Sequence, residues 1–238
     1  MRFRCLLSLI VISAFPALAA DGMYSSAATP APKVARMVDG LPSPDGHNRL
    51  HLRENESTRS SWSFKAWVTT DGKRYSLPYG TYVNAEVAWS PDSRAFFLTY
   101  SDGGNVGTYH VLIYRLDGGR IRRTEPIPNG RSLFKPICFD AENPNVGAIR
   151  WGNDSRTLII AVEVPPHSSC ASMGTFRAFE ITLPDAKVLK TYNQLEAKEL
   201  FRDSLGPELT ASDDDCVKRP ETCVPAGLEF PPSKLKAE

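Results

Sequence analysis

A short pattern that recurs along the chain constrains its fold more than any other feature. Residues 87–104 read VAWSPDSRAFFLTYSDGG, in which an apolar strand ending at Trp89 leads into the tight turn SPDS and then into a second apolar strand. Proline presets φ in such a turn, and the Asp and Ser side chains bond nearby backbone amides. Trp151 and Asp154 repeat the spacing of Trp89 and Asp92 before the apolar run TLIIAVEV. The pattern predicts a repeated strand–turn–strand unit.

A related turn, SPDG at 43–46, precedes these two copies, and each copy continues into a second hairpin. The second turns read TTDGK, LDGGR and LPDAK. Asp-Gly between apolar runs is a strong signal for a β-hairpin. Each unit is therefore expected to hold four antiparallel strands. The distance along the chain from Asp45 to Asp92 and from Asp92 to Asp154 is typical of propellers and repeat arrays.

The motif WSPDS followed by an aliphatic and aromatic strand resembles the WD-like β-propeller repeat of the TolB and prolyl-oligopeptidase-propeller type. The resemblance covers about Leu41 to Tyr192. It implies an all-β fold of three propeller-like four-stranded antiparallel units, as a partial or open β-propeller. Closed propellers usually have four to eight blades. The alternatives are an open stack, a sandwich-like arrangement, a ring closed by a second chain as a homodimer, or an extra strand within 129–147.

The first 19 residues have the pattern of an export signal. Arg2 and Arg4 precede an apolar run from Leu6 to Leu18, and a small-x-small pattern ends at Ala19. We expect cleavage after Ala19, a periplasmic or secreted protein, and no membrane span in the mature chain. An exported chain meets an oxidising compartment, so the remaining cysteines are expected to pair.

The remaining chain divides into a leader, a β domain, a helix and a tail. Residues 20–40 are rich in Ala, Ser, Thr and Pro, which predicts a flexible leader before the β domain at 41–192. Asn193 can cap a helix over 193–206, with Leu195, Leu200 and Leu205 as its apolar positions. Residues 207–238 are polar and Pro-rich, which predicts a loosely ordered tail.

Four cysteines remain after signal cleavage, and an even number suggests two disulfides. Three connectivities are possible. The short, turn-prone segment VKRPET favours a Cys216–Cys223 bridge, which leaves Cys138 and Cys170 as the second pair.

The sequence contains none of the common motifs for catalysis or cofactor binding. G-x-S-x-G, H-E-x-x-H, the P-loop and G-x-G-x-x-G patterns are all missing. His47 and His51 on one strand would lie about 13 Å apart, too far to share a metal. A net charge of +1 disfavours nucleic acid as a partner. We therefore expect no catalytic residue, no cofactor and no metal.

Two groups of residues suggest a docking surface. Arg120, Arg122 and Arg123 form a basic run that is either a solvated strand edge or a patch for an acidic partner. Trp62 and Trp67 belong to the aromatic-rich first unit and suggest a recognition surface.

Together these features predict an exported, non-enzymatic binding or protein-interaction module with a protein partner in the cell envelope. TolB-like repeats commonly serve as such platforms, although a fold does not determine a function. One alternative is a carbohydrate or small-ligand binder that uses the aromatic residues of the first unit. Another is a small secreted hydrolase whose site is built from scattered residues.

Overall fold

The computed structural model of the chain describes residues 22–54, 64–77, 83–103, 107–134, 143–166, 168 and 172–211. The predicted signal peptide, all the cysteines, Trp62 and most of the predicted tail lie outside these residues. Neither the cleavage site nor the disulfide pairing is therefore tested.

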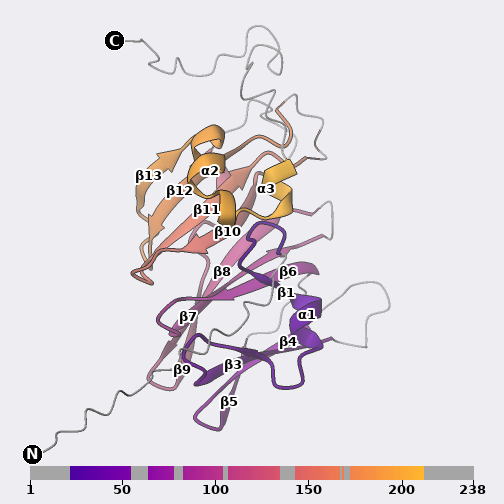
Figure 1. Cartoon of the computed structure of the whole chain (residues 1–238), viewed down its shortest axis with the longest axis vertical. Helices are drawn as coiled ribbons and strands as arrows, with labels where there is room; N and C mark the ends of the chain where they lie inside the picture. The colour runs from indigo at the N-terminus through magenta and orange to yellow at the C-terminus, as the bar shows by residue number, and fades with distance from the viewer. Residues whose placement is uncertain are drawn as a thin grey trace, which may run out of the picture.

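The described residues form three antiparallel sheets, none of which closes on itself, and the prediction of an all-β fold is confirmed (Figure 1). Each sheet contains four strands that are consecutive in the chain. The first sheet contains β2 (Leu41–Pro42), β3 (Asn48–Glu54), β4 (Phe64–Thr70) and β5 (Lys73–Ser76). The second contains β6 (Val83–Trp89), β7 (Ala95–Ser101), β8 (Tyr109–Asp117) and β9 (Arg120–Thr124), and β1 (Thr29–Pro30) is added beside β6. The third contains β10 (Asn145–Trp151), β11 (Thr157–Glu163), β12 (Phe176–Thr182) and β13 (Val188–Tyr192).

The three sheets follow one another along the long axis of the molecule, with the second sheet in the middle (Figure 1). Its strand β7 reads AFFLTYS and is apolar on both faces. Phe96 and Leu98 pack into a core shared with the first sheet, whereas Ala95 and Phe97 pack into a core shared with the third. Because alternate side chains of a strand point to opposite faces, a run of apolar residues fits a strand that is covered on both sides.

The segment expected to be a flexible leader is instead packed along the sheets from Gly22 onward. Tyr24 is fully buried, β1 pairs with β6, and the short helix α1 (Ala31–Ala35) packs against β3. Ala28 and Val34 are also buried. Small side chains let the backbone of this segment approach the sheets closely. An Ala- and Ser-rich composition, which is typical of disordered segments, here allows close packing.

The predicted helix after the last strand is shorter than expected. Helix α2 (Gln194–Leu200) begins with a capping box between Asn193 and Glu196 and packs against β12 and β13. A 3-10 turn follows at Arg202–Ser204. Helix α3 (Pro207–Ala211) occupies the start of the predicted loose tail. Within the described ranges, no helix has the length and apolarity needed to cross a bilayer.

The buried face of α2 also differs from the prediction. Leu195 and Leu200 are largely exposed, and Ala197 and Phe201 are buried against the third sheet instead. Phe201 packs edge-on against Tyr192 at 5.0 Å between ring centroids. Leu205 is buried as expected, but it lies beyond the helix.

Candidate functional site

The turn between the first two strands of each sheet has the same construction. In the second sheet, Ser90 Oγ donates to Asp92 Oδ1 at 2.6 Å, and the same oxygen accepts the backbone N–H of Arg94 at 3.1 Å. Asp45 accepts both equivalent bonds in the first sheet. In the third sheet Asp154 accepts the backbone N–H of Arg156, and, because Gly152 replaces the serine, the hydroxyl bond comes from Thr157 instead. These aspartates therefore cap the backbone.

Equivalent turns on neighbouring sheets are bonded to each other. Ser93 Oγ accepts the backbone N–H of Asp45 at 3.0 Å, and Ser155 Oγ accepts that of Asp92 at 3.0 Å. Both serines have positive φ, 62° for Ser93 and 56° for Ser155. The left-handed conformation at the end of each turn thus places a hydroxyl against the preceding sheet.

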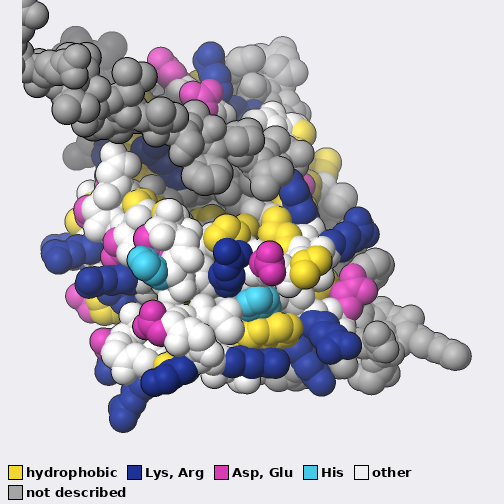
Figure 2. All heavy atoms as spheres, turned by 60° about the horizontal axis from the view of Figure 1, so that its bottom comes forward, with side chains coloured by type: hydrophobic (Ala, Val, Ile, Leu, Met, Phe, Trp, Pro, Cys, Tyr) yellow, Lys and Arg dark blue, Asp and Glu magenta, His cyan; other side chains and the backbone are white. Residues whose placement is uncertain are grey.

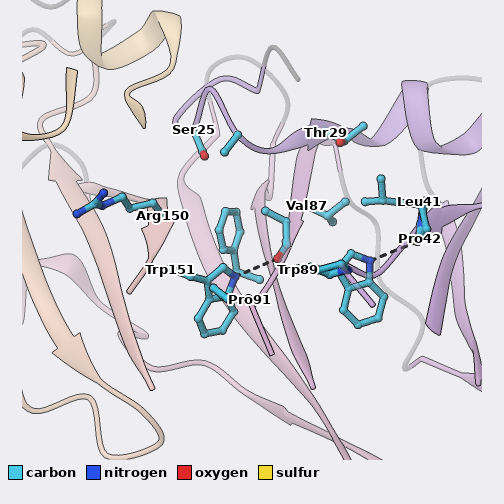
Figure 3. A pocket seen from close by; sticks show the side chains of 13 residues that line it. Ser25, Thr29, Leu41, Pro42, Val87, Trp89, Pro91, Arg150 and Trp151 are labelled. Carbon is cyan, nitrogen blue, oxygen red and sulfur yellow. Dashed lines mark hydrogen bonds between the residues drawn. The ribbon is translucent and has the colours of Figure 1, made fainter. Parts of the chain in front are cut away.

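The two tryptophans of the repeat make a second set of links between sheets. Trp89 Nε1 donates to the carbonyl oxygen of Leu41 at 3.3 Å, and Trp151 Nε1 donates to that of Ala88 at 3.1 Å (Figure 3). Each indole therefore joins the first strand of its own sheet to the first strand of the preceding sheet.

These links border a groove where the N-terminal segment passes over the first strands of the sheets (Figure 3). Its volume is about 430 Å³, within the ~300–1,000 Å³ that is common for ligand sites. Aliphatic, prolyl and aromatic side chains form most of its walls. The lining residues are Ser25, Ala27, Thr29, Leu41, Pro42, Pro44, Val87, Ala88, Trp89, Pro91, Phe97, Arg150 and Trp151.

Few polar groups face this groove. The Ser25 side chain is fully buried, and its hydroxyl has no hydrogen-bond partner in the described structure. Figure 3 shows this oxygen directed toward the groove. Arg150 is the one ionisable residue among those described in the lining, and its guanidinium lies over the ring of Phe201, 5.1 Å from the centroid. The lining therefore suits binding of an apolar group that forms one hydrogen bond, and it offers no pair of groups for proton transfer.

Two buried carboxyl groups, those of Glu86 and Glu163, lie behind the N-terminal segment, and no sequence motif marks them. The backbone N–H of Tyr24 donates to Glu86 at 3.2 Å, and the Tyr24 hydroxyl donates to Glu163 Oε2 at 2.7 Å. Burial raises the pKa of both carboxyls to about 8. Glu86 also borders a second cavity of about 530 Å³, next to Glu208. Because both carboxylates accept bonds from the chain itself, they hold the N-terminal segment in place. The one feature of the sequence that could have indicated them is a glutamate within a mostly apolar strand, β6 for Glu86 and β11 for Glu163.

Of the predicted docking residues that the structure describes, Trp67 lies on the first sheet and the three arginines lie on the second. Trp67 lies on the face of the first sheet that points away from the second sheet. Its ring is stacked on His51 at 5.0 Å between centroids, and Arg74 Cζ lies 4.1 Å from the ring centroid. Both faces of the indole are therefore covered by the chain's own groups.

The arginines of the predicted patch are on β9, the edge strand of the second sheet, and they are exposed. In the register with β8, Arg122 is opposite Arg115, whereas Arg123 is opposite Tyr114. Arg120 and Arg122 therefore share one face, and Arg123 points to the other. Arg122 is also 3.5 Å from Asp117.

Neither the family models nor the curated proteins contain a match to this chain. Among solved structures, the chain is similar to an acylaminoacyl peptidase from Pyrococcus horikoshii (orthorhombic crystal form), with a TM-score of 0.38 and 13% sequence identity. The match covers 64% of this chain and 24% of the peptidase chain, so this chain spans about a quarter of that protein. A likeness at this level is too distant to indicate a function.

Proposed function

We propose that this chain is an exported, non-enzymatic binding module that holds an apolar segment of a partner protein in the groove lined by Trp89 and Trp151. The observation that supports the proposal is the composition of that groove. Its walls are aliphatic, prolyl and aromatic, and one buried hydroxyl, that of Ser25, has no partner among the described residues. An unpaired buried hydroxyl costs about 1–3 kcal/mol, which a hydrogen bond from an occupant would recover.

We infer further that the three sheets are the blades of an open β-propeller of TolB-like repeats. Three observations support this inference. The sheets have the same strand order, each has a turn capped by an aspartate, and the second and third sheets make equivalent tryptophan and serine bonds to the preceding sheet. The inner ends of propeller blades commonly line a central site, and the groove lies along the first strands of the three sheets.

The carbohydrate-binding alternative has less support. A sugar ring stacks on an open aromatic face, and both faces of Trp67 are covered by His51 and Arg74. The hydrolase alternative would need a nucleophile beside a base. Ser25 and Thr29 are the hydroxyl side chains among the described residues of the groove lining, and these residues include no histidine or carboxylate.

A groove-filling substitution tests the proposal. Ala27 is exposed and lines the groove, so Ala27→Trp is expected to block the groove without disturbing the core. Val38→Trp is the matched control, because Val38 is 96% exposed and lies outside the groove lining.

Tagged mature chains would be used to capture partners from the native envelope fraction by cross-linking, with quantification by mass spectrometry. We expect one saturable partner that Val38→Trp retains and Ala27→Trp loses. Equal capture by both variants would contradict a role for the groove.

A further inference from the structure

The outward face of the first sheet differs from the equivalent faces of the other two sheets. In the second and third sheets this face packs on the preceding sheet, with Trp89 or Trp151 as the link. In the first sheet, Pro42 occupies the position of the tryptophan, and Gly46 occupies the position of Ser93. The residues that would attach a further sheet are therefore replaced at this end of the molecule.

All the charged side chains at the outward positions of β3, β4 and β5 are positive. Leu50, Leu52, Ala66 and Val68 point into the core, so the alternate residues point outward. The charged outward residues are Arg49, Arg53, Lys65 and Arg74, and we call this surface the cationic face. Figure 2 brings this end of the molecule forward and shows Lys and Arg side chains there beside a histidine and a hydrophobic group, with Asp and Glu side chains around them.

The strand register arranges these cations in two rows. Arg53 is opposite Lys65, and Arg49 and Arg74 are both opposite Thr69. Arg53 is four positions after Arg49 along β3, so the rows lie about 13 Å apart. The end unit of a stacked repeat needs a polar outer face for solubility, but charges of both signs would serve that purpose. Four charges of one sign indicate an anionic partner.

The centre of the cationic face is held rigid by a stack across three strands. Trp67 lies between His51 and Arg74, and His51 Nε2 is 2.6 Å from Thr69 Oγ1. Burial lowers the pKa of His51, and the charges of Arg49 and Arg74 lower it further. Asp39, at the margin, raises the pKa of His51 by less than these effects lower it. The ring of Trp67 thus contacts the guanidinium of Arg74, which stays exposed to a partner.

We propose that the cationic face binds an acidic polysaccharide, whose carboxylate or sulfate groups pair with the two rows of cations. The three strands β3, β4 and β5, of 7, 7 and 4 residues, cover roughly 300 Å². A stable protein–protein interface takes about 800 Å² per partner, so a folded protein needs more surface than this. The large, exposed hydrophobic residues of the described structure all lie outside β2–β5, which leaves no apolar anchor on these strands for a membrane. A charged chain needs only regularly placed cations. This site does not depend on the proposed function of the groove.

The test compares two acidic polysaccharides, polygalacturonate and heparin, with neutral dextran as the blank. Arg53→Gln with Lys65→Gln removes one row of the cationic face. Arg120→Gln with Arg122→Gln is the matched control, because it removes the same charge from exposed positions on β9. Kd would be measured by isothermal titration calorimetry at several salt concentrations.

We expect the wild-type chain to bind one or both acidic polymers but not dextran, and the polymer it prefers identifies the anionic group. The row variant should bind about tenfold more weakly, with a smaller salt dependence, whereas the control should bind like the wild-type chain. An equal loss in the control, no binding to either polymer, or tighter binding to phosphatidylglycerol vesicles would each overturn the proposal.

Discussion

Replacing Glu163 with glutamine is expected to make the protein more stable than the wild-type chain at about pH 8. The Glu163 side chain is fully buried, and its Oε1 has no hydrogen-bond partner in the described structure. Burial raises the pKa of this carboxyl to about 8, and Glu208 acts in the same direction. Hydrogen bonds from Tyr24 and Asn145 lower the pKa but do not offset burial.

The direction of the effect follows from the two pKa values of the carboxyl. Its pKa in the folded state, about 8, lies above the ordinary value of 4.5, so the folded state binds the proton more tightly. The resulting stabilisation is fully present below pH 4.5 and is lost as the pH rises through 8. Each pH unit in this window lowers the free energy of unfolding by about 1.4 kcal/mol, so Glu163 alone accounts for roughly 5 kcal/mol over the window. Glu86 has a shift of the same sign and size.

Glutamine has no proton to lose, and its amide oxygen can still accept the bond from the Tyr24 hydroxyl. Urea unfolding at about pH 5, 6.5 and 8 would give the free energy of unfolding of each variant. We expect Glu163→Gln to halve the pH dependence between pH 5 and 8. Glu180→Gln is the control, because Glu180 also accepts a bond from a tyrosine hydroxyl, that of Tyr192 at 3.2 Å, but is partly exposed. An unchanged pH dependence in Glu163→Gln would refute the reasoning.

Three further substitutions test single features of the fold. Trp151→Phe removes the donor to the Ala88 carbonyl and should cost about 1–3 kcal/mol of unfolding free energy, measured by urea unfolding; an unchanged midpoint would contradict the role of the indole. Gly147→Ala would place a Cβ 2.1 Å from the ring of Tyr24, so limited proteolysis should cut the N-terminal segment faster than in the wild-type chain; equal rates would count against tight packing there. Asn193→Ala breaks the capping box of α2 and should cost about 1 kcal/mol, seen as a lower urea midpoint; no shift would mean that tertiary packing alone holds the helix.

The three sheets could be read from the sequence because the signals that specify them are local. A Ser-Pro-Asp turn bonds its own backbone within a few residues, and Ser90 and Asp92 make the bonds that the motif predicts. The alternation of apolar residues then shows where each strand lies. The role of Trp89 in packing between sheets could also be inferred from its fixed place in the repeat.

The candidate site depends on contacts between segments that are far apart in the chain, and no local pattern reports them. The groove combines Ser25 from the N-terminal segment, Pro42 from the first sheet, and Trp151 from the third. Ala28 is buried only because a sheet edge lies beside it. The composition of residues 20–40 carries no sign of that sheet, and it therefore predicted a flexible leader.

The buried face of α2 and the cationic face were likewise decided by tertiary structure. Helical spacing allowed several apolar stripes on α2, and the third sheet selected the one containing Ala197 and Phe201. Alternation along a strand places Arg49 and Arg53 on one face of β3, but only the register with β4 sets Lys65 beside Arg53. Local backbone chemistry therefore determines the strands and turns of this protein, whereas its surfaces and its groove form only when strands distant in sequence are aligned.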